Sequence, residues 1–207
     1  AIASTTSKAH GIWASARENE DVAEYLPILT EIINLKRQKA EALAEAGNYY
    51  DALADDYEPG MSTNHVSVMF EELRPTLVDL RKEILAEDKI PHVTGNFNKN
   101  IQLSLAKELA IIFGYDLNKG RIDIAAHPFS SGCGDDVRIT TRTDPSDPFN
   151  CIYSTIHEVG HATYEQNINN DYVFTPLGRG VSLGVHESQS RIFENQLGRS
   201  RAFTSWL

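Results

Sequence analysis

Two histidines four residues apart constrain this chain more than any other feature of its sequence. They belong to the run His157-Glu158-Val159-Gly160-His161. On an α-helix, residues with this spacing lie about 40° apart around the axis, so both imidazoles can reach one metal ion. The glutamate between them points to the side where an attacking water would sit, and zinc hydrolases use such a glutamate as general base. The run therefore predicts a helix that holds a catalytic metal through His157 and His161, with Glu158 as the base.

A catalytic zinc ion usually has three protein ligands and one open position, so a third ligand must come from elsewhere in the chain. Glu165 lies eight residues after His157, about 12 Å along a helix, which is too far for one ion. We interpret it as a surface carboxylate or a supporting group. The adjacent residues His186 and Glu187 follow after a connection long enough for an antiparallel return. Neighbouring helical side chains diverge by about 100°, so only one of the two can face the metal.

Apolar residues at helical spacing dominate residues 1–118, and the pattern changes after that point. Alternating polar and apolar residues at 121–126 and 137–142 predict two strands that pair antiparallel across the intervening loop. We expect a mainly α fold, a zincin-like helical peptidase body with a small antiparallel β-sheet before the histidine-bearing helix. Residues 119–207 would contain the sheet and the metal-binding helices, within the same catalytic domain as the helical region. The predicted helices span residues 21–46, 63–86, 99–113, 150–167 and 183–206.

The predicted strand at residues 137–142 comes just before the metal-binding helix. In many zinc peptidases the substrate adds as an extended strand to a sheet edge beside the metal, where main-chain hydrogen bonds position the scissile bond. We expect residues 137–142 to form that edge. The predicted substrate-binding residues are accordingly Arg138, Thr140, Arg142 and His186. A purely structural hairpin is the alternative interpretation of the two strands.

Charge and hydropathy narrow the classes of partner. The formal net charge is −10, from 19 basic and 29 acidic side chains, which argues against nucleic acid or an anionic membrane surface as partner. The sequence has no run of 18 apolar residues and so predicts no membrane-spanning helix. Cys133 and Cys151 are too few for a disulfide framework. We expect both to be free thiols in a reducing, cytoplasmic compartment.

Several further runs extend the five-residue motif into a longer pattern. They are His127-Pro-Phe129, Asp136-Val-Arg-Ile-Thr-Thr-Arg142, Ile156-His-Glu-Val-Gly-His-Ala162, Tyr164-Glu-Gln166 and Ser182-Leu-Gly-Val-His-Glu-Ser-Gln-Ser-Arg191. In order and spacing, from about residue 50 onward, the chain closely resembles the carboxypeptidase Taq family of metallocarboxypeptidases. The resemblance implies a mostly helical, cleft-shaped peptidase that removes residues from peptide C-termini with broad specificity.

The resemblance also implies a metal ion, Zn²⁺ or Co²⁺, held by His157, His161 and Glu187 with Glu158 as base. It thereby chooses Glu187 over His186 as the third ligand. It further implies a cytoplasmic homodimer that acts on peptide substrates. Family chains are more than twice as long, so we expect this chain to be truncated at both ends. The missing part would include stretches that hold the substrate's terminal carboxylate. The isolated chain is expected to bind metal weakly or partly and to have little or no carboxypeptidase activity.

Two other functions fit the same residues. The metal site alone does not separate exo- from endo-cleavage, so an endopeptidase or oligopeptidase is one alternative. A test peptide with a blocked or a free C-terminus would distinguish the two. The other alternative is a catalytically inactive helical fragment that only binds metal or self-associates through exposed apolar surface. Metal titration combined with a peptidase assay would separate this alternative from an enzyme.

Overall fold

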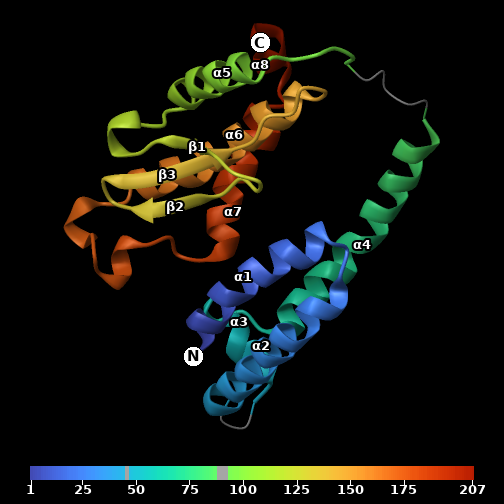
Figure 1. Cartoon of the computed structure of the whole chain (residues 1–207), viewed down its shortest axis with the longest axis vertical. Coiled ribbons are helices and arrows are strands. Elements are labelled where there is room, and N and C mark those ends of the chain that lie inside the picture. The colour runs from blue at the N-terminus through green and yellow to red at the C-terminus, as the bar shows by residue number, and fades with distance from the viewer. Residues whose placement is uncertain (45–46, 88–92) are drawn as a thin grey trace. The chain divides into compact units, whose positions relative to one another are not determined.

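The computed structural model describes residues 1–44, 47–87 and 93–207 of a chain that divides into two compact units, Ala1–Glu87 and Asp88–Leu207 (Figure 1). The fold is mainly helical with a small three-stranded sheet, which confirms the predicted fold class. Helix α5 (Lys99–Ile112) belongs to the second unit. The change of sequence pattern after residue 118 had grouped this helix with the preceding ones. That both units form one catalytic domain stays a prediction. Within the described ranges, no helix is long and apolar enough to cross a bilayer.

The described residues of the first unit form four helices: α1 (Ile2–Glu18), α2 (Val22–Leu43), α3 (Tyr49–Ala54) and α4 (Thr63–Ala86). A polar side chain caps the start of three of them. Asp21, Asn48 and Ser62 accept hydrogen bonds from the first backbone N–H groups of α2, α3 and α4, groups that have no partner within the helix. The helix predicted at 21–46 is present up to Leu43, and residues 45 and 46 lie outside the described residues.

The second unit contains the sheet and the motif helix. After α5 come a 3-10 turn η1 (Leu117–Lys119), β1 (Ile122–Ile124), β2 (Ser130–Cys133), β3 (Asp136–Thr141), α6 (Pro148–Gln166), two 3-10 turns η2 (Asn170–Tyr172) and η3 (Pro176–Gly178), α7 (Leu183–Arg191), a π-helical turn η4 (Ile192–Leu197) and α8 (Arg201–Trp206). The helix predicted at 183–206 is therefore interrupted, because α7 passes into a π-helical turn and the chain leaves helical geometry before α8.

The strands are ordered β1-β3-β2, with β3 in the centre. It pairs parallel with β1 and antiparallel with β2. The predicted antiparallel pairing of residues 121–126 with 137–142 is therefore wrong. The segment predicted as a connecting loop folds into β2 and occupies the antiparallel side of β3. Gly132 and Gly134 have φ values of 145° and 57°, a backbone conformation that glycine adopts without steric cost and that lets the chain turn tightly into β3.

Helix α6 packs against β2 and β3 of the sheet and against helices α5 and α7, all within the second unit (Figure 1). Strand β3 presents Val137, Ile139 and Thr141, all fully buried, on the face that packs against α6. Val159 of α6 and Ala110 of α5 belong to the same apolar cluster. Burial of this face holds α6 firmly against the sheet, so the opposite face of the helix, which carries the motif histidines, has a defined position.

Candidate metal centre

Three potential ligand atoms converge where α6 meets α7. His157 and His161 lie on the same face of α6 with ring centroids 4.9 Å apart, and Glu187 approaches them from α7. Its Oε2 atom lies 3.7 Å from Nε2 of His157 and 3.3 Å from Nε2 of His161. One ligand atom from each of the three residues lies within 4.8 Å of the other two. Two imidazole nitrogens and one carboxylate oxygen are a donor set that fits a divalent ion such as zinc and leaves a fourth position open.

The protonation states of this cluster suit a metal. Burial and, to a smaller extent, the neighbouring rings of His186 and His157 together lower the pKa of His161 to about 4. The imidazole is therefore neutral at pH 7, which is the form that binds metals. Burial alone would raise the pKa of Glu187, but a hydrogen bond from Arg191 and the proximity of His157 outweigh this and lower it. Glu187 is therefore ionised at neutral pH.

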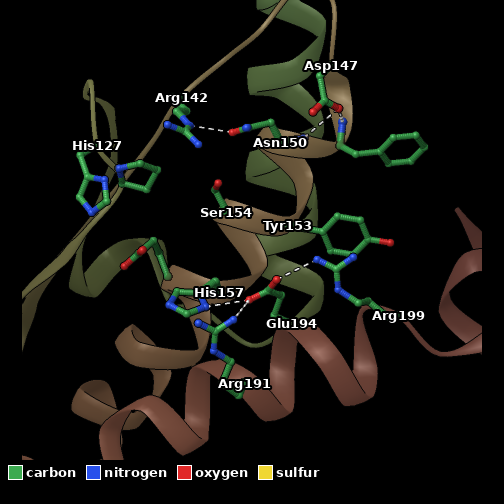
Figure 2. A pocket seen from close by; sticks show the side chains of 13 residues that line it. His127, Arg142, Asp147, Asn150, Tyr153, Ser154, His157, Arg191, Glu194 and Arg199 are labelled. Carbon is green, nitrogen blue, oxygen red and sulfur yellow. Dashed lines mark hydrogen bonds and ion pairs between the residues drawn. The ribbon is translucent and has the colours of Figure 1, made fainter. Parts of the chain in front are cut away.

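Glu158 is buried beside the cluster, with only 6% of its surface exposed. Burial, together with the negative charge of Glu187, raises the pKa of Glu158 to about 7. Two cavities, of about 700 Å³ and about 620 Å³, are both lined by Glu158 and His157. Figure 2 shows the larger one. Glu158 thus lies beside the cluster and lines both cavities that border it.

The sequence and the fold both match known metallopeptidases. A model of the carboxypeptidase Taq (M32) metallopeptidase family matches residues 1–207. This chain belongs to the M32 family. It is 42% identical to thermostable carboxypeptidase 1 of Thermus thermophilus and 40% identical to thermostable carboxypeptidase 1 of Pyrococcus furiosus, in each case over 98% of the chain. The crystal structure of an M32 carboxypeptidase from Deinococcus radiodurans covers 99% of the chain with a TM-score of 0.84 at 38% identity.

This M32 chain spans 42% of the length of the two thermostable carboxypeptidases and 43% of the Deinococcus radiodurans structure. The matched part includes both units and the whole candidate metal centre.

The π-helical turn after α7 supplies a carboxylate that the sequence pattern did not reveal. Oε2 of Glu194 lies 3.0 Å from Nδ1 of His157, on the opposite side of the ring from the nitrogen that faces Glu187. Arg191 and Arg199 bind the same carboxylate at 3.1 and 2.8 Å (Figure 2). A carboxylate on Nδ1 fixes the orientation of a metal-binding imidazole. No simple periodicity signals a π-helical turn, so the sequence pattern gave no indication of Glu194.

Glu187 is oriented by residues of its own helix. Nε of Arg191 donates a hydrogen bond to Oε1 of Glu187 at 2.7 Å, one helical turn away. The hydroxyl of Ser190 donates to Oε2 at 3.2 Å. Because Arg191 holds Oε1, the other oxygen is directed toward the two histidines. Arg191 therefore helps to arrange the candidate metal centre through Glu187 and Glu194.

Two predicted substrate-binding residues, Arg138 and Thr140, line neither cavity among the described residues. Arg138 is exposed and pairs with Asp136, whereas Thr140 is buried and its hydroxyl accepts a hydrogen bond from the backbone N–H of Phe129 at 2.9 Å. The expectation that residues 137–142 form a sheet edge is wrong, because β3 carries a strand on each side. Thr140 instead supports the segment that leads into β2, which lines the smaller cavity through Ser130.

The other two predicted substrate-binding residues have different environments. Arg142 lines the larger cavity, where its Nε donates a hydrogen bond to Oδ1 of Asn150 at 2.7 Å (Figure 2). His186 lines the smaller cavity, but its two ring nitrogens lie against His161 and Glu165. Of the adjacent pair, Glu187 is the residue that groups with the two motif histidines as a possible metal ligand.

Gly160 allows α6 and α7 to approach each other closely enough for Glu187 to reach the two motif histidines. A Cβ atom at residue 160 would fall 2.6 Å from Cα of Ser190 and 2.9 Å from the carbonyl oxygen of Gln189. Both are backbone atoms, which cannot move away by a change of rotamer. A side chain at residue 160 would therefore push α7, and with it Glu187, away from the histidines.

We expect Gly160→Ala to destabilise the second unit. A glycine-to-alanine change inside a helix normally gains roughly 0.5–1 kcal/mol, but forcing a methyl group into a packed contact typically costs about 1–3 kcal/mol. The expected net loss in the free energy of unfolding is about 1–2 kcal/mol, measured by urea denaturation, together with weaker zinc binding. Gly11→Ala in α1 is the control, because a Cβ there meets nothing within 4 Å. Unchanged stability and zinc affinity in Gly160→Ala would contradict the close helix contact.

Proposed function

We propose that this chain carries the catalytic metal centre of a metal-dependent carboxypeptidase that hydrolyses C-terminal peptide bonds with broad specificity. The observation that carries the proposal is the convergence of His157, His161 and Glu187 beside the buried Glu158, at the border of two cavities. The proposed ion is Zn²⁺, with Co²⁺ as the alternative, because the donor set of two imidazoles and one carboxylate is typical of catalytic zinc sites.

When bound, a divalent ion acts as a Lewis acid that polarises the scissile carbonyl and lowers the pKa of the attacking water. The remaining steps belong to side chains of the chain itself. Glu158 accepts the proton of the attacking water and then delivers it to the amine that leaves. Its position supports this role, because Glu158 lies between two ligand residues in the sequence and borders both cavities without belonging to the ligand cluster.

Arg142 is our candidate for holding a substrate carboxylate. Among the described residues Arg142 forms no ion pair, whereas Arg191 and Arg199, which line the same cavity, both pair with Glu194. The hydrogen bond from its Nε to Asn150 leaves the terminal guanidinium nitrogens to face a ligand. A guanidinium can bind a carboxylate through two parallel hydrogen bonds, and this is a common device for recognising a terminal carboxylate.

The substrate class, oligomeric state and compartment that we propose rest on the same family membership. Peptides are the proposed substrates, and the net charge of −10 supports peptides over nucleic acid as partner. A cytoplasmic homodimer is the proposed state of the full-length protein.

The test compares one peptide with a free C-terminus and the same peptide with an amidated C-terminus, with products identified by mass spectrometry. The full-length protein is expected to release single residues from the free peptide only, and EDTA should abolish the release. Internal cleavage of both peptides would favour an endopeptidase or oligopeptidase. If the 207-residue chain assayed by itself binds one metal ion without any hydrolysis, the inactive-fragment alternative is favoured. Absence of bound metal after zinc loading would overturn the proposed centre.

A further inference from the structure

The two motif histidines direct the same ring nitrogen toward the candidate metal position. Nε2 of His157 and Nε2 of His161 both face Oε2 of Glu187. To bind a metal ion through Nε2, a neutral imidazole must carry its hydrogen on Nδ1 instead. The group that contacts Nδ1 therefore decides whether each ring is ready to bind. For His157 this group is the carboxylate of Glu194, but for His161 it is a second histidine.

The contacts of that second histidine determine which ring nitrogens carry hydrogen. Nε2 of His186 lies 2.7 Å from Oε1 of Glu165. An ionised carboxylate only accepts hydrogen bonds, so Nε2 of His186 must donate, and a neutral His186 then has no hydrogen on Nδ1. Nδ1 of His186 lies 2.6 Å from Nδ1 of His161 and must therefore accept. His161 consequently carries its hydrogen on Nδ1, which leaves the lone pair of its Nε2 directed at the metal position.

Packing holds this chain of contacts in place. The side chains of His186 and Glu165 are 22% and 13% exposed. The ring of Tyr164 lies edge-on against the ring of His186 at 5.2 Å, and its hydroxyl accepts a hydrogen bond from the backbone N–H of Val181. A Cβ at Gly180 would fall 2.7 Å from Cδ2 of His186 and 3.3 Å from Oε1 of Glu165. The segment before α7 can therefore cover the pair only because residue 180 has no side chain.

We propose that His186 and Glu165 are positioning residues that act through His161: they hold it in the tautomer with the hydrogen on Nδ1 and thereby raise the metal affinity of the centre. This inference rests on the proposed metal centre. In this role the two residues contact neither the substrate nor the metal. Such supporting contacts typically change metal affinity by about 10–100-fold when removed.

The first measurement reads the tautomers directly in the metal-free chain, by ¹⁵N NMR of the histidine rings at about pH 8, where an ordinary imidazole is neutral. We expect the hydrogen of His161 on Nδ1 and that of His186 on Nε2. In His186→Ala, His161 should lose this preference. A parent chain in which His161 carries its hydrogen on Nε2 would overturn the proposal whether or not the chain binds metal, so this outcome is distinct from failure of the proposed centre.

The second measurement is a zinc titration with Zn²⁺ alone in competition with a chelator. His186→Ala and Glu165→Met are expected to weaken zinc binding by about 10–100-fold. His186→Gln keeps an acceptor and a donor on one side chain and should restore part of the affinity. Glu108→Met, which removes an exposed carboxylate from α5, is the control and should bind zinc like the parent chain. Parent-like affinity in both His186→Ala and Glu165→Met would overturn the proposal, as would equal loss in His186→Gln and His186→Ala with the fold intact by circular dichroism.

Discussion

Glu158→Gln is expected to slow hydrolysis by about 10²–10⁴-fold while leaving the metal in place. The amide has nearly the same shape as the carboxylate, but it cannot accept the proton of the attacking water. General acid–base catalysis typically contributes about 10²–10⁴-fold to a rate, and we expect a loss in that range. Metal binding should survive, because Glu158 is not one of the three residues whose ligand atoms converge. The measurements are kcat on a peptide with a free C-terminus, made on the full-length protein, and elemental analysis of the same preparation.

The control for this variant is Glu108→Gln, which makes the same chemical change at an exposed position of α5. It should alter neither kcat nor metal content. Loss of the metal from Glu158→Gln would show that Glu158 helps to hold the ion, and a nearly normal rate would show that another group accepts the proton. Either result would remove Glu158 from the role of base.

Glu187→Ala is expected to weaken zinc binding by more than 100-fold, which is beyond the range of about 10–100-fold that supporting residues typically reach. The variant removes the carboxylate oxygen that lies 3.3 and 3.7 Å from the two histidine nitrogens. His186→Ala removes a neighbour on the same helix that contacts Nδ1 of His161, whereas Nε2 of that ring faces Glu187. The two variants therefore compare a ligand with a supporting residue, and both are measured by zinc titration of the same chain.

Arg191→Ala provides a matched comparison, because it keeps Glu187 but removes the hydrogen bond that holds its Oε1. We expect an effect between those of the parent chain and Glu187→Ala. A larger loss of zinc affinity in His186→Ala than in Glu187→Ala would reverse the assignment of the third ligand. Circular dichroism of each variant would show whether the fold is intact.

The helical part of the fold could be predicted closely because helices are built from local contacts. The helix predicted at 63–86 is found as Thr63–Ala86, and the one predicted at 99–113 ends at Ile112. The spacing of apolar residues and the capping side chains act within a few residues of one another. The same reasoning explains why one five-residue run placed His157 and His161 on a common helix face.

The pairing of the strands, by contrast, was predicted wrongly. Both predicted strands exist, as β1 and β3, but their pairing is parallel. Alternation of polar and apolar residues reveals which face of a strand is buried, as it did for Val137 and Ile139, but it does not reveal the partner or its direction. The pairing depends on the path of the chain between the strands, where residues 130–133 form a strand of their own. The expected substrate edge failed for the same reason.

The sequence by itself determined the family, the helix that carries His157, Glu158 and His161, and a choice of third ligand that rested on resemblance. The tertiary structure decided which atoms meet. It directs Oε2 of Glu187 at both histidines, and it brings Glu194, which no pattern had indicated, to Nδ1 of His157. These contacts join residues 26 to 37 positions apart, and they depend on the close approach of α6 and α7 and on a π-helical turn. Both features arise from packing between segments distant in the sequence, which short-range periodicity does not encode.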